Sequence, residues 1–169
     1  MAAARGASFQ AQPAEALADL PGRAFDLIAA FDVLEHVPES ELIAFLNLLA
    51  GRTRIGGAIV LRYPNADTWL GNVFQHGDPT HLSAIGHLKM QYLADQANLE
   101  IVAYRAPTRR GFRTSAIHGI HALTAGTLIR IIAGVQKVLY FPALLHIVLS
   151  SSNVICVLTP RDQGRPSAR

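Results

Sequence analysis

The stretch FDLIAAFDVLEHV, residues 25–37, constrains the fold of this chain more than any other. Its first part, residues 25–31, is an apolar run without regular alternation, which is typical of a strand covered on both faces. The ionisable residues Asp32, Glu35 and His36 follow at the point where a helix is expected to begin. Ligand sites in open α/β sheets lie at the carboxyl ends of strands. The stretch therefore predicts a buried strand that leads into a functional site.

The rest of the chain alternates predicted helices and strands. The pattern predicts a helix after Pro38, a turn at Gly56-Gly57, a strand at 58–63, an irregular segment at 66–86, a helix at 88–97 and a strand at 99–104. An apolar segment at 117–149 and a last strand at 153–158 follow. This order predicts an α/β fold with a parallel sheet and a helical insert before the last strand. We expect a single domain over 1–160, with the insert at about 114–150, and a flexible tail at 161–169.

Composition limits the location and the partners. The net charge of +3 is small, and no nucleic-acid partner is expected. The cluster formed by Arg105, Arg109, Arg110 and Arg113 is either a solvated loop or a contact for an anionic substrate or membrane surface. Cys156 is the only cysteine, and its apolar neighbours predict a buried strand thiol, no disulfide and a cytoplasmic location.

Several segments, in this order and spacing, resemble the class I S-adenosylmethionine-dependent methyltransferases. They are FDLIAAFDVLEHV, the following helix, RIGGAIVLRYPN and HGDPTHLSAIGHLKMQYLADQANLEIV. The match covers about residues 8–106 and the final strand at 153–158. It implies a Rossmann-like methyltransferase sheet in which residues 25–31 are the family's fourth strand. The GDPTH segment is most similar to the small-molecule branch, which implies methyl transfer to oxygen or nitrogen of a small acceptor.

The resemblance also implies a set of cofactor and substrate residues. Residues at the end of the family's fourth strand line the methionine end of S-adenosylmethionine, and here they are Phe31, Asp32, Val33 and Leu34. Where the family often has an acidic-apolar pair beside the adenine, this chain has Gln12, Pro13 and Ala14, so Gln12 and Ala14 are the candidates there. Asn65 and Asp78 are expected on the substrate side.

Part of the family pattern is missing from the sequence. No GxGxG pattern occurs, although the family uses a first strand and a glycine-rich loop to hold the cofactor's carboxypropyl end. In the family that strand lies beside the one at residues 25–31, which would otherwise be an exposed apolar edge. We therefore expect a truncated gene model, a degenerate fragment, or a partner or second copy that covers the edge.

The ionisable cluster supports two kinds of chemistry. His36 and His81 are candidate general bases, because histidine titrates near neutral pH. Asp32, Glu35 and His36 at i, i+3 and i+4 share one helix face if Asp32 belongs to the first turn, and His81 could complete a divalent-cation site with them. The set resembles the cation site of some RNA and quinone O-methyltransferases, where the cation lowers the pKa of the acceptor hydroxyl. The alternative is structural, with Asp32 capping the helix and Glu35 interacting with its dipole.

The apolar segment at 117–149 allows three arrangements. It could hold a membrane span, two helices packed on the sheet edge, or an amphipathic pair that rests on a membrane or a partner. Arg130 and Lys137 are placed to meet anionic headgroups in the third arrangement.

The leading hypothesis is a partial methyltransferase that acts on a small acceptor. The alternative is a non-catalytic methyltransferase-like remnant or interaction module, associated with a membrane surface through residues 117–149.

Overall fold

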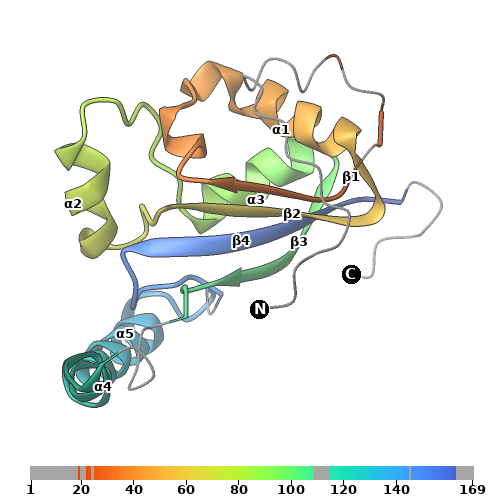
Figure 1. The fold of residues 1–169 in the computed structure, drawn as a ribbon. Coiled ribbons are helices and arrows are strands. Elements are labelled where there is room, and N and C mark those ends of the chain that lie inside the picture. Colours follow the sequence, from red (N-terminus) through yellow and green to blue (C-terminus); the bar gives the residue numbers. More distant parts are fainter. Residues whose placement is uncertain (1–18, 20–21, 24, 109–114, 145, 163–169) are drawn as a thin grey trace.

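In the computed structural model, the described residues are 19, 22–23, 25–108, 115–144 and 146–162. They form a four-stranded sheet in the order β1-β2-β4-β3 (Figure 1). The strands are β1 (Phe25–Phe31), β2 (Thr53–Pro64), β3 (Leu99–Arg105) and β4 (Asn153–Pro160). The mixed α/β architecture is as the sequence predicts. β1 lies at one edge of the sheet, where it pairs with β2 alone among the described strands.

The direction of the last strand differs from the prediction. β1 and β2 are parallel, whereas β4 runs antiparallel to both β2 and β3, so the sheet is mixed. The reason lies in the connection from β3 to β4. Arg105 at the end of β3 pairs with Ile155 near the start of β4, so the chain leaves and re-enters the sheet at the same end. A strand that starts where its neighbour finishes must run in the opposite direction.

Two helices cover one face of the sheet. α1 (Leu42–Arg52) and α3 (His87–Gln96) contact each other, and they pack against β2 and β3 respectively (Figure 1). Their buried residues Leu42, Leu46 and Met90 meet alternate residues of the strands, such as Ile59 and Leu61, in the main hydrophobic core. This arrangement follows from the helical spacing of the apolar residues in α1 and the two-residue period of the strands.

The second face of the sheet is only partly covered. Along β1 the side chain of Ala30 is buried, while Leu27 and Phe31 are 59% and 51% exposed. The outward residues of β2 and β4, among them Val60 and Val157, are half-buried. The prediction that residues 25–31 are covered on both faces is therefore wrong for the described structure. A strand sequence suited to burial on both faces here has one apolar face open.

Local structure departs from the sequence pattern at two further places. The segment expected to be irregular contains the helix α2 (Trp69–Gly77), whose start is capped by the Thr68 hydroxyl accepting the Gly71 N–H at 2.9 Å. The expected turn at Gly56-Gly57 is instead part of β2. It forms a bulge opposite Phe25 and Leu27, with Gly56 at a φ of +79° that suits glycine.

The helices expected before the last strand are α4 (Ala116–Leu123) and α5 (Ala125–Tyr140), which stand off from the sheet in Figure 1. None of their residues belongs to the main hydrophobic core of the described residues. That core does contain Cys156, which is fully buried at the centre of β4 opposite Leu61 and Tyr104. Burial raises the pKa of the Cys156 thiol to about 12. The expected buried strand thiol is confirmed.

Candidate functional site

The candidate site lies beyond the carboxyl end of β1. The chain leaves β1 through Asp32, whose φ of 55° lies in the left-handed region, and enters a short 3₁₀ turn, Leu34–His36. The Asp32 carboxylate forms an ion pair with Arg62 of β2, and the Arg62 guanidinium also lies 5.4 Å from the centre of the Phe31 ring. Asp32 is therefore paired with the neighbouring strand, and it is not among the residues that come together as potential cation ligands.

The backbone of Glu35 attaches the loop before α3 to this turn. Its carbonyl oxygen accepts the N–H groups of Leu82 and Ser83 at 2.7 and 3.1 Å. These bonds bring His81 beside His36, with ring centres 4.7 Å apart in an edge-on arrangement. Two histidines separated in the sequence by α1, β2 and α2 thus lie side by side, as expected of His36 and His81.

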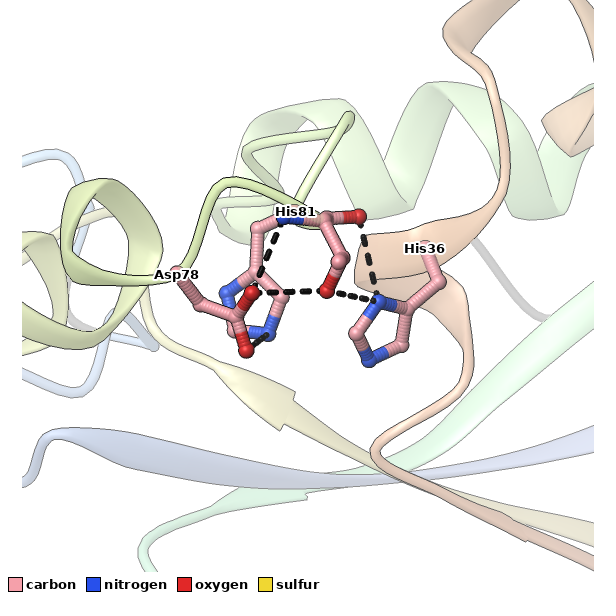
Figure 2. A network of polar contacts seen from close by, with 4 residues as sticks. His36, Asp78 and His81 are labelled. Atoms are coloured by element: carbon pink, nitrogen blue, oxygen red, sulfur yellow. Dashed lines mark hydrogen bonds and ion pairs between the residues drawn. The ribbon is translucent and has the colours of Figure 1, made fainter.

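A chain of hydrogen bonds orients His36 (Figure 2). Its Nδ1 lies 3.1 Å from both the carbonyl and the hydroxyl oxygen of Thr80. The Thr80 hydroxyl in turn donates to the Asp78 carboxylate at 2.7 Å, and the Thr80 N–H donates to the same oxygen at 2.9 Å. These bonds lower the pKa of Asp78, which is therefore ionised at neutral pH. With Nδ1 as the donor to Thr80, Nε2 of His36 carries the free lone pair.

Glu35 and His81 contribute buried polar atoms to the same cluster. The Glu35 side chain is 1% exposed, and its Oε2 has no hydrogen-bond partner in the described part of the chain. Burial raises the pKa of Glu35 above its ordinary value, and the nearby Asp32 charge adds to this effect. The buried Nδ1 of His81 also has no partner there, while Nε2 lies 3.7 Å from the Asp78 carboxylate.

Three of the four predicted metal ligands are brought together. One ligand atom from each of Glu35, His36 and His81 lies within 4.8 Å of the others. Two ligands held at about 2.1 Å from one cation lie at most about 4.2 Å apart, so small side-chain rotations would close the set. The cluster combines one carboxylate and two imidazoles, a donor set that suits Zn²⁺ or Mn²⁺.

The remaining predicted residues have varied positions. Val33 is exposed at the carboxyl end of β1, whereas Leu34 is fully buried in the core. Asn65 is also fully buried, and its amide donates to the carbonyl oxygens of Val148 and Ser151, the latter at 3.2 Å. It holds the end of β2 to the segment before β4, and its role on the substrate side stays a prediction. Gln12 and Ala14 lie outside the described residues.

Sequence reasoning missed the role of Thr80. Its backbone and side chain both bond to the carboxylate two residues earlier, which is the local turn that an Asp-Pro-Thr sequence favours. That signal was available in the sequence, but the contact between Thr80 and His36 depends on the tertiary fold.

Comparison with solved structures relates the fold of this chain to that of known proteins. A SAM-dependent methyltransferase from Archaeoglobus fulgidus matches 86% of this chain with a TM-score of 0.55 and 16% identity. A SAM-dependent methyltransferase from Thermotoga maritima matches 84% of it with a TM-score of 0.50 and 11% identity. The chain has the class I methyltransferase fold. A Haloferax volcanii protein described as a methyltransferase, solved in complex with the Trm112 methyltransferase activator, matches 87% with a TM-score of 0.50 and 9% identity.

The methyltransferase fold is represented here in part. The chain spans 63% of the A. fulgidus protein, 60% of the H. volcanii protein and 59% of the T. maritima protein. No protein-family model and no curated protein sequence matches the chain.

An apolar cavity lies near the carboxyl end of β2 in this methyltransferase fold. It has a volume of about 530 Å³ and is formed between α2 and the pair α4 and α5. Phe74 of α2 lines it, and Trp69 lines a neighbouring cavity of about 420 Å³. Tyr63 of β2 is fully buried in the core.

Proposed function

We propose that the chain is the acceptor side of a SAM-dependent methyltransferase that acts on an oxygen or nitrogen of a small molecule. The observation that carries the proposal is the cluster of Glu35, His36, Asp78 and His81 at the carboxyl end of β1, where α/β sheets bind their ligands. The methyltransferase fold and the position of the cluster at the end of β1 support the proposal together.

In the proposed reaction His36 accepts the proton of the acceptor. Asp78 holds Thr80, and Thr80 holds Nδ1 of His36, so Nε2 is left as the basic atom. The Asp78 charge then stabilises the protonated ring through the same chain of hydrogen bonds. This arrangement orients the base and stabilises its protonated form.

The described residues offer one wall of a cofactor site. When bound, S-adenosylmethionine supplies a methyl group from its sulfonium centre for in-line displacement. The exposed side chains of Phe31 and Val33 would contact it at the carboxyl end of β1. Groups for its ribose and carboxypropyl ends are lacking among the described residues at this edge, which fits a site that is completed elsewhere.

We propose that a further strand pairs with β1 and completes that site. The supporting observation is that β1 has β2 as its one partner in the described sheet, and the exposed Leu27 and Phe31, with the half-buried apolar residues on the same face of β2 and β4, would accept an element packed on that face. The strand would come from a segment encoded with this chain, from a second copy or from a partner that covers the edge. Without such a strand, the edge invites pairing with unrelated chains.

A divalent cation at Glu35, His36 and His81 is the competing use of the same cluster. The specific observation in its favour is the pair of buried atoms, Oε2 of Glu35 and Nδ1 of His81, that have no hydrogen-bond partner among the described residues. A cation there would bind the acceptor oxygen and lower its pKa. Titration of the metal-free protein with Zn²⁺ and Mn²⁺ separates the two uses. Saturable binding that His81→Ala abolishes and His76→Ala retains supports the cation, and absence of binding leaves the histidine as base.

Calorimetric titration with S-adenosylmethionine tests the proposed function. We expect binding that weakens in Phe31→Ala and is unchanged in Leu88→Ala, a substitution of an equally exposed apolar residue on α3. In a methylation assay with candidate acceptors, His36→Ala should lower turnover, while the exposed His76→Ala on α2 should not. Failure to bind at millimolar cofactor would overturn an enzymatic role for this chain and leave the non-catalytic remnant or interaction module.

A further inference from the structure

In the helices α4 and α5 small residues are buried and large apolar residues are exposed. Gly119, Gly126 and Ala133 are the buried residues, and they are spaced seven residues apart. Nine large aliphatic side chains are exposed instead, among them Ile117 at 79% and Val138 at 69%. The others are Ile120, Leu123, Leu128, Ile131, Ile132, Val135 and Leu139. Large exposed apolar patches mark contacts with a membrane or another apolar surface.

The segment that carries these helices has formal charges of one sign, whereas Asp67, from the chain before α2, lines a cavity beside the end of α5. The sequence has no acidic residue between Glu100 and Asp162. Within the described part of that span, Arg105 and Lys137 line one cavity of about 580 Å³ near the C-terminal end of α5. Arg130 is exposed along α5. An apolar face on a helix whose opposite side carries cations complements an anionic lipid surface, in which headgroup charge lies beside hydrocarbon.

Aromatic residues occur where α5 ends. Tyr140 is 73% exposed and Phe141 is 40% exposed, one turn beyond Lys137. Aromatic rings and long cationic side chains concentrate at the boundary between headgroups and hydrocarbon. The end of α5 therefore has the composition of a segment that lies at this boundary.

The fold argues against a single crossing of the membrane. Residues 116–140 form the one stretch of the described chain that is long and apolar enough to span a bilayer. However, the helix is interrupted at Thr124, and the 16 residues of α5 reach only about 24 Å, against about 30 Å of hydrocarbon. In addition, β3 and β4 are paired neighbours whose ends nearest the helices coincide. The segment must return to the side from which it came.

We propose that α4 and α5 lie in the plane of an anionic bilayer surface, with their aliphatic side chains in the outer hydrocarbon and Arg105, Arg130 and Lys137 toward the headgroups. This places the apolar cavity between α2 and these helices next to the lipid. The contact is independent of methyl transfer and can be tested without cofactor or acceptor.

Flotation of the full chain with vesicles tests the contact. The probes are equimolar phosphatidylcholine–phosphatidylglycerol vesicles and pure phosphatidylcholine vesicles. We expect the protein to float with the anionic vesicles, to bind the neutral ones weakly, and to lose binding as NaCl is raised, because salt screens the headgroup charge. The double variant Ile131→Asn/Val138→Asn should bind roughly tenfold or more weakly, because it removes two inserted side chains.

The matched control is Leu88→Asn/Tyr92→Asn, which removes similarly exposed apolar side chains from α3. It should bind like the parent, and circular dichroism should show that both variants are folded. Protein that stays unbound with anionic vesicles would overturn the proposal, as would equal binding by the two double variants. A concentration-dependent dimer that is dissociated by Ile131→Asn/Val138→Asn and does not bind vesicles would assign the face to a second copy instead.

Discussion

Replacing Gly71 with alanine tests how α2 is held against the end of β2. A Cβ on Gly71 would overlap the carbonyl oxygen of Asn65 and lie 2.6 Å from its carbonyl carbon, closer than the 3.0 Å that real Cβ atoms keep. The obstacle is backbone, and Asn65 itself is fixed by its bonds to Val148 and Ser151. Overpacking of this kind destabilises by up to about 3 kcal/mol, and alanine's better helix propensity returns about 1 kcal/mol. We expect Gly71→Ala to lower the free energy of unfolding by about 2 kcal/mol.

Gly134 in α5 provides the matched control. It is a helical glycine on which a Cβ would have no neighbour within 4 Å, so Gly134→Ala should stabilise the protein by up to about 1 kcal/mol. Urea unfolding followed by circular dichroism measures both variants. Trp69, the only tryptophan, begins α2, and its fluorescence should shift in Gly71→Ala as the helix moves. A Gly71→Ala protein as stable as the parent, with unchanged fluorescence, would refute the packing argument.

Two further perturbations have predictable signs. Burial raises the pKa of Glu35, so the folded state binds the Glu35 proton more tightly than the unfolded chain does. The contribution of Glu35 to the free energy of unfolding is therefore full at acid pH and is lost as the pH rises through the raised pKa. Glu35→Gln should therefore be more stable than the parent by about 1 kcal/mol at pH 7 in chelator, with the difference disappearing at acid pH; a pH-independent difference in urea midpoints would contradict this. Asn98, which follows α3 at a φ of 53°, should tolerate glycine, whereas Asn98→Val should destabilise by about 1–2 kcal/mol in thermal unfolding. Equal stability of the Gly and Val variants would count against the left-handed conformation.

The strands and the covered face were accessible from sequence because they depend on local periodicity. The apolar spacing in α1 and the runs at β1, β2 and β4 predicted the elements that build the main core. Strand direction was not accessible, because it depends on where the chain re-enters the sheet after α5. The helix α2 was missed because its glycines and aromatics suggested an irregular segment, although Thr68 is a suitable N-cap residue.

The candidate site was also predicted in part, because some of its residues lie in a local sequence pattern. Glu35 and His36 follow a strand end, so their placement could be read from the local pattern, and His81 joins them as expected. Asp32 was assigned to the cation set because of its spacing, but Arg62, thirty residues later, takes its carboxylate. Such a competition between partners is decided by strand pairing, here between Phe31 and Arg62, and has no signature in either segment alone.

The burial of Cys156 gives this molecule an internal reporter. A single thiol at the centre of the sheet is inaccessible to reagents in water, and its proton is held well beyond neutral pH. Alkylation therefore requires the core around Cys156 to open, so the rate at which the unmodified chain is labelled reports how often that core opens. A strand added at the β1 edge, a cofactor or a lipid surface would each slow that labelling in proportion to how strongly it stabilises the closed core.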